Sequence, residues 1–570
     1  MLSLLWFATG IVPAFPVPTW PHGNKDIQST LASIEERLKD LVANEKYGTT
    51  SFSVQLTSNT ESLWTQFHTA RKFNESRPGD RHVDGDSVYR IASISKLFTT
   101  LGLLYQHDAG NVSLDDPISK YIPKLSGDLP WDDITLRILA SQLSGIPRET
   151  VQSDIINLVE DPTAFGLPPV SRDGLPTCDE YSGFERPCNW TDILDALSKF
   201  QPIFAPNQKS TYSNAAFELI GLVLEKVSGE KYEDYIQHAI FDPLGMKSST
   251  FKTPSDKHAV IPSGETYWGI NEGSQNPTGG IYSTASDMTK FVRYIMTHFN
   301  TLATGVNWLM PASPSGGIYN FYGMPFEIFR TDKLLEDSAR PVTFVTKGGG
   351  LPAYSSKVIV MPEYGLGLTV LVGGEADLLD EIIEIVTVDL LRAVEKIIWK
   401  EVEEVYSGVY TAIDPSLNST LVLSASPSTG LIINSWISNS TVVYSDSATK
   451  KDNPIMNILT GSTESDEDED QEPPVRLQLS PTLLYKNESA QQGQIWMLTA
   501  SYARDGKQRK VWDDDCTADV DSGGAYAGIS ITKGVFWLED EVLELPGWRV
   551  KTKRTGSKGG KSPAFFKQDL

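Results

Sequence analysis

The sequence predicts an α/β (α+β) domain followed by an all-β domain. Strand-like runs occur at 51–56 and 63–68 and return between 342 and 372, whereas the stretch between them is helical and rich in loops. Both ends of the first domain are therefore expected to build one antiparallel sheet, flanked by helices, with the helical stretch forming a second wall. The length of 570 residues also exceeds the usual size of one hydrophobic core, which favours at least two domains.

Helices of the first domain are predicted from apolar residues that recur at helical spacing. One such pattern, over 27–41, predicts an amphipathic helix before the first strands. A second helix is expected to begin at Ser93, because leucines follow at 97, 101 and 104. A long helix is expected from Leu378 to Val405, where charged residues punctuate the apolar pattern. Residues 25–404 are assigned to this first domain.

The remaining residues, 405–570, show a pattern of short β-rich runs. These runs lie at 409–412, 420–424, 431–435, 494–501 and 535–538. Short strands in succession are typical of a β sandwich or barrel. The sequence therefore predicts an all-β C-terminal domain.

Composition restricts the partners that this chain can have. The formal net charge of -24 at pH 7 argues against nucleic-acid binding and favours solubility in an acidic or extracellular setting. After the amino terminus, no uninterrupted apolar run is long enough to cross a bilayer. The seven histidines show no close metal-binding spacing, and no nucleotide-binding loop joins a strand to a helix. We expect no cofactor, no metal, no nucleic acid and no membrane span, and the oligomeric state stays open.

Residues 1–20 are expected to be a secretory signal segment. An apolar stretch ends there in the small residues Val12 and Ala14, but no Lys or Arg precedes it, so a buried N-terminal arm is the alternative. Cys178 and Cys188 bracket a loop and could close a disulfide in an oxidising compartment. Six Asn-x-Ser/Thr sequons are candidate glycosylation sites, at Asn74, Asn111, Asn189, Asn418, Asn439 and Asn487. Together these features favour a secreted, extracellular protein.

The first motif that carries chemistry is Ser93-Ile94-Ser95-Lys96, where an extended segment gives way to an apolar helix. Ser93 would lie at the positive end of that helix, with Lys96 one turn along the same face. A lysine can take the serine proton if burial or neighbouring cations lower its pKa. The same S-x-x-K spacing recurs at four other serines, none of them where a strand enters an apolar helix. This spacing alone therefore does not identify Ser93 as catalytic, and companion motifs are needed to support that role.

Tyr212-Ser213-Asn214 precedes a second apolar helical run. A phenol has an ordinary pKa of about 10, but flanking ammonium groups would favour the phenolate and let Tyr212 shuttle a proton. A simple capping turn, with Ser213 or Asn214 as N-cap, is the alternative.

Lys347-Gly348-Gly349-Gly350 lies between the predicted strands 341–347 and 356–361. Glycines let a substrate approach the backbone, whose amides can stabilise an oxyanion, while Lys347 adds positive charge. A Gly-rich hairpin with a solvated lysine is the alternative. Aromatic residues at 267–268, 308 and 319–322 could bind an apolar substrate, and core packing explains them equally well.

Taken in this order, the three motifs resemble those of serine beta-lactamase-related proteins: class C beta-lactamases, DD-peptidases and related esterases. Within that family, the chain resembles secreted fungal beta-lactamase-like proteins with an extra C-terminal beta domain. The resemblance, over roughly residues 28–400, implies a beta-lactamase/transpeptidase-like fold with a helical subdomain. It also implies acyl transfer through an acyl-enzyme on Ser93, with Lys96 and Tyr212 sharing the proton. Asn214 would orient Lys96 and the substrate.

The same resemblance assigns roles to the third motif. The oxyanion would be met by the amide of Ser93 and by one on the edge from Gly349 to Gly350. Gly348 departs from the family pattern, which commonly has a hydroxyl residue there that helps to hold a substrate carboxylate. Its absence argues against efficient penicillin hydrolysis and leaves room for neutral esters or amides.

The sequence thus favours a secreted serine hydrolase that cleaves a small-molecule ester, amide or lactam through Ser93. The alternatives are an acyltransferase or transesterase of secondary metabolism, a D-amino-acid peptidase and a non-catalytic binding protein. No Gly-x-Ser-x-Gly elbow occurs, which argues against a hydrolase with a histidine triad.

Overall fold

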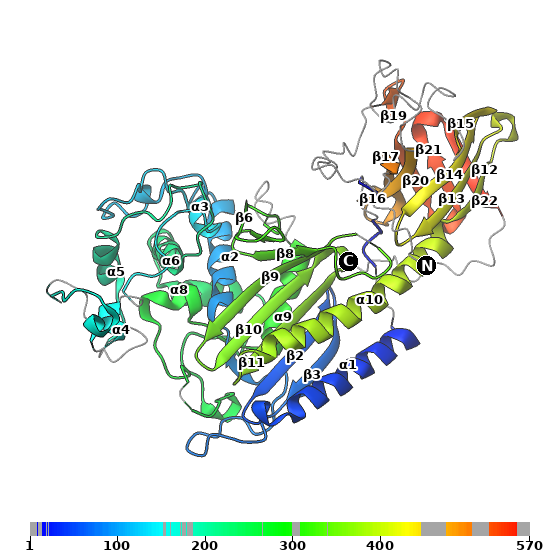
Figure 1. The fold of residues 1–570 in the computed structure, drawn as a ribbon. Helices are drawn as coiled ribbons and strands as arrows, with labels where there is room; N and C mark the ends of the chain where they lie inside the picture. The colour runs from blue at the N-terminus through cyan, green and yellow to red at the C-terminus, as the bar shows by residue number, and fades with distance from the viewer. Residues whose placement is uncertain are drawn as a thin grey trace. The chain divides into compact units, whose positions relative to one another are not determined.

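The computed structural model describes residues 8–9, 14–18, 20, 22–151, 155–159, 161–171, 173, 178, 186–264, 266–298, 308–338, 340–445, 475–503 and 524–555. The chain forms two compact units. The sheet-and-helix unit comprises Ala32–Arg330 and Thr343–Thr387, and the barrel unit comprises Met1–Leu31, Thr331–Val342 and Val388–Leu570. Figure 1 shows the elements of both units.

The sheet-and-helix unit is built on an antiparallel sheet with the strand order β3-β2-β11-β10-β9-β8-β7-β6. Its strands are β2 (Ser51–Ser58), β3 (Ser62–His68), β6 (Ser313–Pro314), β7 (Asn320–Tyr322), β8 (Glu327–Thr331), β9 (Val342–Leu351), β10 (Tyr354–Met361) and β11 (Leu366–Gly373). The early strand β2 pairs with the late strand β11 along its whole length. Both ends of the unit therefore build one sheet, as the sequence predicts.

Helices cover both faces of this sheet. α9 (Ala285–His298) packs against β2 and β11 on one face. The parts of α1 (Lys25–Ala43) and α10 (Leu378–Tyr406) that belong to this unit lie over the other face (Figure 1). Every residue of β2 and β11 is consequently buried. The predicted fold class, an antiparallel sheet flanked by helices, is confirmed.

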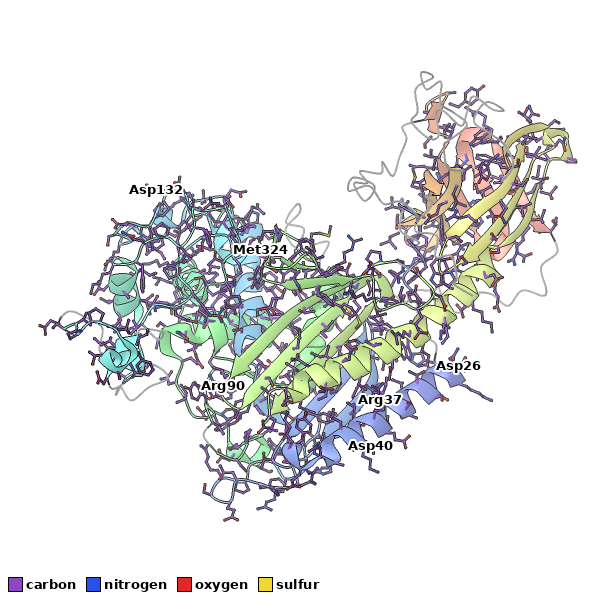
Figure 2. The ribbon with its side chains drawn as sticks, viewed as in Figure 1. Asp26, Arg37, Asp40, Arg90, Asp132 and Met324 are labelled. Carbon is purple, nitrogen blue, oxygen red and sulfur yellow. A yellow bond between two sulfur atoms is a disulfide. The ribbon has the colours of Figure 1, made fainter. Side chains whose placement is uncertain are left out.

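The amphipathic pattern of α1 explains its place. Ile34, Leu38 and Val42 are buried, whereas Arg37 and Asp40, which are labelled in Figure 2, are exposed. The long helix α10 is likewise confirmed and ends one residue beyond the predicted end. Among the described residues, no helix is long and apolar enough to cross a membrane.

The second wall of the unit is helical. Its principal helices pack on one another: α2 (Ser95–Asp108), α6 (Asn214–Ser228), α7 (Tyr232–Ile236) and α8 (Asn276–Gly279). The three leucines that predicted the helix after Ser93 are fully buried on α2. Smaller helices complete the wall: α3 (Leu136–Ala140), α4 (Ile155–Leu158) and α5 (Trp190–Leu197). Cys178 and Cys188 form the disulfide that their spacing suggested.

In its described residues, the barrel unit is all β apart from its parts of α1 and α10 and short turns. Its main strands are β12 (Gly408–Ala412), β13 (Thr420–Ser426), β14 (Gly430–Ser438), β16 (Val475–Asn487), β17 (Gln492–Ala503), β20 (Lys533–Trp537), β21 (Val542–Leu545) and β22 (Val550–Thr555). They follow the order β17-β16-β14-β13-β12-β22-β21-β20, and β20 pairs back onto β17. This closure leaves the ring of main strands without a free edge. The prediction of an all-β C-terminal domain is confirmed.

Short strands complete the description of the barrel unit. β1 (Ala8–Thr9) pairs with β17, and β15 (Thr441–Ser445) pairs with β14. β18 (Ala525–Tyr526) and β19 (Ile529–Ser530) form a separate small hairpin. Inside the barrel, the ring of Trp496 lies 4.8 Å from that of Tyr406 and 5.4 Å from that of Phe536. This aromatic cluster anchors the end of α10 in the barrel core.

Candidate active site

Ser93 lies in a tight 3-10 turn, η2 (Ala92–Ile94), between β4 (Val88–Arg90) and α2. The residue before it, Ala92, is buried and has φ of 47°, a left-handed conformation that is strained for a residue with a Cβ atom. The helix therefore begins at Ser95, and the expected start at Ser93 was wrong because the strand-to-helix turn comes first. Ser93 still precedes the positive end of α2.

Lys96, on the first turn of α2, is fully buried beside Ser93. Its Nζ lies 3.0 Å from Ser93 Oγ and donates to the carbonyl of Thr278 at 2.9 Å. Burial lowers the pKa of Lys96, and the nearby charge of Lys347 lowers it further, against the opposing influence of Tyr212. A lysine with a lowered pKa, placed within hydrogen-bond distance of a hydroxyl, can act as its general base.

Tyr212 lies in the loop that enters α6. Its ring centre is 5.2 Å from the Nζ atom of Lys96 and 5.3 Å from that of Lys347. Burial opposes ionisation, but the charges of Lys347 and Lys96 and a hydrogen bond with Ser93 outweigh it and place the pKa of Tyr212 at about 8. Ser213 caps α6 by accepting from the amide of Ala216. The segment is thus both a capping turn and a part of the site.

Lys347 is on β9 and is not the solvated lysine of the alternative interpretation, because its side chain is 1% exposed. Its Nζ lies 2.6 Å from Glu327 Oε1 and 2.7 Å from the carbonyl oxygen of Gly348. Burial alone would lower the pKa of Lys347, but the carboxylate of Glu327 raises it above its ordinary value. The ammonium correspondingly lowers the pKa of Glu327 despite burial. The two residues form a charged pair.

Gly349 brings β9 against the nucleophile turn. A Cβ atom at this position would lie 2.2 Å from the carbonyl oxygen of Ile91, 2.6 Å from Ser356 Oγ and 3.1 Å from the amide nitrogen of Ser93. Only glycine permits this approach. Since the edge from Gly349 to Gly350 lies beside the Ser93 amide, their backbone donors can converge on one oxyanion.

Asn214 lies at the start of α6, but its contact differs from the expected one. Its side-chain amide donates to Glu149 Oε1 at 2.5 Å. Lys96 is held instead by the carbonyl of Thr278. Burial raises the pKa of Glu149, and the hydrogen bond from Asn214 opposes this rise. The predicted role of Asn214 in orienting Lys96 therefore has no support in this hydrogen bond.

Comparisons with known proteins agree with this geometry. The family model described as Beta-lactamase matches residues 34–388. The chain belongs to the beta-lactamase family. A second model, described as Beta-lactamase-like-like, C-terminal domain, matches residues 398–556.

Two curated relatives and one solved structure are among the proteins to which this chain is similar. "Probable hydrolase clz13" of Cochliobolus lunatus is 32% identical over 565 residues, which is 93% of this chain and 88% of that protein. "Beta-lactamase-like protein" of Arthroderma benhamiae is 32% identical over 427 residues, 71% of this chain and 70% of that protein. A crystal structure of a beta-lactamase/D-alanine carboxypeptidase from Yersinia pestis, complexed with citrate, matches with a TM-score of 0.48 and 21% identity, covering 64% of this chain and 98% of that one.

Several groups of this beta-lactamase-family site escape sequence reasoning. Glu327 belongs to no motif, and only the sheet brings β8 to Lys347. Thr278 acts through its carbonyl, which every residue type carries. Of the candidate aromatics, Trp268 and Trp308 are core residues, whereas the ring of Tyr322 lies 6.4 Å from that of Tyr212. Among the described residues, no group of three or more His, Cys, Asp or Glu side chains could hold a metal.

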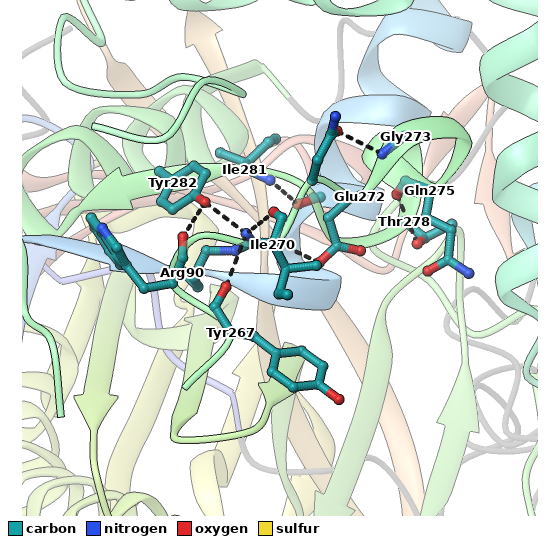
Figure 3. A network of polar contacts seen from close by, with 12 residues as sticks. Arg90, Tyr267, Ile270, Glu272, Gly273, Gln275, Thr278, Ile281 and Tyr282 are labelled. Carbon is teal, nitrogen blue, oxygen red and sulfur yellow. Dashed lines mark hydrogen bonds and ion pairs between the residues drawn. The ribbon is translucent and has the colours of Figure 1, made fainter. Parts of the chain in front are cut away.

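A buried ion pair supports the nucleophile turn from behind. Arg90 ends β4 and pairs with Glu272, and their side chains are 0% and 1% exposed. Arg90 Nη1 also donates to the hydroxyl of Tyr282 at 2.8 Å and to the carbonyl of Ile270 at 3.0 Å (Figure 3). Glu272 opens the segment that leads to Thr278. The network therefore ties the strand before Ser93 to the segment whose carbonyl holds Lys96.

We expect Arg90→Met to lower the free energy of unfolding by about 3–5 kcal/mol, because Glu272 would be left buried without its cation. Urea denaturation measures this change. Arg392→Met is the matched control: Arg392 pairs with Glu336 at 3.2 Å, both side chains are at least one-third exposed, and the expected cost is below about 1 kcal/mol. Equal losses in the two variants would contradict a supporting role for the Arg90 network.

Proposed function

We propose that this protein hydrolyses an ester or amide through a covalent acyl-Ser93 intermediate. The observation that carries the proposal is the 3.0 Å contact between Ser93 Oγ and Lys96 Nζ, whose pKa burial lowers. Tyr212, with its pKa at about 8, supplies a second group that can exchange a proton near neutral pH. The names of its relatives, which include a probable hydrolase, support the same class of reaction.

In the proposed acylation, Ser93 Oγ attacks the substrate carbonyl and forms a new C–O bond. The hydroxyl proton passes to the coupled pair of Lys96 and Tyr212, and neither residue alone is assigned as the base. The amide of Ser93 and an amide of the Gly349–Gly350 edge receive the oxyanion. When the tetrahedral intermediate collapses, the bond to the leaving alcohol or amine breaks and the pair returns the proton to it. Water then attacks the acyl-enzyme by the same route and releases the acid.

The experiment for this function is a product analysis with purified protein. 4-Nitrophenyl esters, matched 4-nitroanilides and a chromogenic beta-lactam are supplied with and without an added alcohol or amine acceptor. Free acid as the main product at every acceptor concentration supports the hydrolase. If the acyl group is transferred to the acceptor and little free acid forms, the protein is an acyltransferase that uses the same residues, and the hydrolase proposal is wrong. No turnover of any substrate by folded protein would contradict an enzymatic function.

The protonation state of the pair predicts the pH dependence of this hydrolysis. The base form accumulates as pH rises, so kcat/KM should increase with pH through an apparent pKa near the Tyr212 value of about 8. Tyr212→Phe should lower kcat/KM about a hundredfold or more. Tyr212→Phe should also move the rising limb of the pH profile, the pH range over which kcat/KM increases, to lower pH. The reason is that Tyr212 raises the pKa of Lys96 in the wild type.

Tyr322→Phe is the control for this pH profile. Burial raises the pKa of Tyr322, so its phenol stays neutral across the rising limb and its loss should leave the limb in place. A Tyr212→Phe profile that superimposes on the wild-type profile would contradict the coupled pair.

We also propose that the protein is secreted and glycosylated. Five of the sequon asparagines are exposed and Asn74 is partly exposed, so that each could accept a glycan. The disulfide between Cys178 and Cys188 is typical of an oxidising compartment. Expression in a eukaryotic host followed by mass spectrometry of the medium tests this proposal, and intracellular retention with residues 1–20 still attached would contradict it.

A further inference from the structure

We propose that Glu327 acts as an internal counter-ion that makes the site select uncharged acyl groups over anionic ones. This inference rests on the proposed hydrolase function and names its substrate class. Two residues of the third motif, Lys347 and Gly348, carry the argument together with Glu327.

The Glu327 carboxylate accepts hydrogen bonds from two donors of this motif, the Lys347 ammonium and the Gly348 amide. Its Oε1 accepts from Lys347 Nζ at 2.6 Å, and its Oε2 accepts from the amide of Gly348 at 3.0 Å. The carbonyl of Glu327 accepts from Thr346 Oγ1 at 2.8 Å, which fixes the residue against β9. The carboxylate therefore satisfies the donors that a substrate anion would need.

Gly348 supplies the room for this carboxylate. A Cβ atom at position 348 would lie 3.3 Å from Glu327 Oε2, closer than ordinary van der Waals contact, so a side chain there would press on the carboxylate. The position of the Glu327 carboxylate therefore depends on the absence of a side chain at position 348. The absence of a hydroxyl residue after Lys347 coincides with a carboxylate that takes its place.

Exposure decides which charge a substrate meets. The Glu327 side chain is 33% exposed, whereas that of Lys347 is 1% exposed. An arriving anion would approach the carboxylate before the ammonium, and like charges a few ångströms apart repel. Arg148 lies over the Tyr212 ring, with Glu149 3.5 Å from it, and Lys357, opposite Gly348 on β10, adds a charge that also lowers the pKa of Glu327. An uncharged acyl group meets no such repulsion.

The test compares two esters with acyl chains of equal length, 4-nitrophenyl butyrate and the anionic 4-nitrophenyl hemisuccinate. In the wild type, kcat/KM for butyrate should exceed that for hemisuccinate by about ten- to a hundredfold. Glu327→Gln should shift this ratio at least about tenfold towards hemisuccinate, chiefly through KM, because Lys347 is then free to attract the anion. Adding Lys347→Met to Glu327→Gln should abolish the shift. Because the readout is a ratio, it does not depend on how much total activity a variant keeps.

Glu336→Gln removes an exposed carboxylate that pairs with Arg392 elsewhere in the chain, and it should leave the ratio unchanged. A wild-type ratio in Glu327→Gln would overturn the inference while ester hydrolysis, and with it the proposed function, stands. If Glu327→Gln fails to fold, the wild type alone decides, because equal or faster hydrolysis of hemisuccinate overturns the inference. Failure of the folded wild type to hydrolyse these esters and the 4-nitroanilides described above would overturn the proposed function itself.

Discussion

Ser93→Ala is expected to lower kcat for ester hydrolysis by about 10⁴-fold or more, because no other group replaces a lost nucleophile. The Ser93 hydroxyl contacts groups of the site, Lys96 and Tyr212, so the fold should survive its removal. Steady-state kinetics measure the first effect, and urea denaturation should show a change in unfolding free energy within about 1 kcal/mol.

Ser95→Ala is the control within the same motif. The Ser95 hydroxyl is buried and accepts from the amide of Ile281 at 3.2 Å, so its loss should cost about 1 kcal/mol of stability while the nucleophile remains. Hydrolysis by Ser93→Ala at the wild-type rate would remove Ser93 from the mechanism. If Ser95→Ala loses as much activity as Ser93→Ala, the loss reflects the integrity of the turn and not the Ser93 hydroxyl in particular.

Gly349→Ala is expected to lower kcat/KM by about a thousandfold or more. The new Cβ atom would lie 2.2 Å from the carbonyl oxygen of Ile91, a backbone atom that cannot move aside without moving the nucleophile turn. Displacing β9 removes an oxyanion donor, which costs about 10²–10³ in rate, and misplaces Ser93 as well. The same kinetic assay measures this loss.

Gly350→Ala is the matched control, because a Cβ atom at position 350 would meet nothing within 4 Å. This variant keeps its backbone amide and should stay within about tenfold of the wild-type rate. Similar activity in the Gly349→Ala and Gly350→Ala variants would contradict the close approach of β9 to Ser93.

The sequence predicts those parts of the site that depend on residue type and order. Ser93, Lys96, Tyr212 and Lys347 occur in motifs whose chemistry is readable from the chain, and the structure brings all four together. The start of α2 could not be predicted, because Ala92 adopts a left-handed conformation that the sequence usually signals with a glycine. Asn214 has the expected residue type but bonds to Glu149.

Groups contributed by neighbouring elements are invisible to this reasoning. Glu327 reaches Lys347 because β8 and β9 are adjacent in the sheet, and Thr278 contributes only backbone. The same limit applies to the barrel unit: its short strands could be predicted, but its closure depends on the pairing of β17 with β20. Local patterns give elements and motifs, whereas long-range pairing determines which of them meet.

The central claim is the acyl-enzyme on Ser93, and covalent labelling tests it most directly. Wild type and Ser93→Ala are exposed to a fluorophosphonate and, with rapid acid quenching, to 4-nitrophenyl butyrate, followed by intact-mass measurement and peptide mapping. We predict a single adduct on the peptide that contains Ser93 in the wild type and no adduct in the variant. Folded wild-type protein without an adduct, or with the adduct on another residue, would contradict the mechanism.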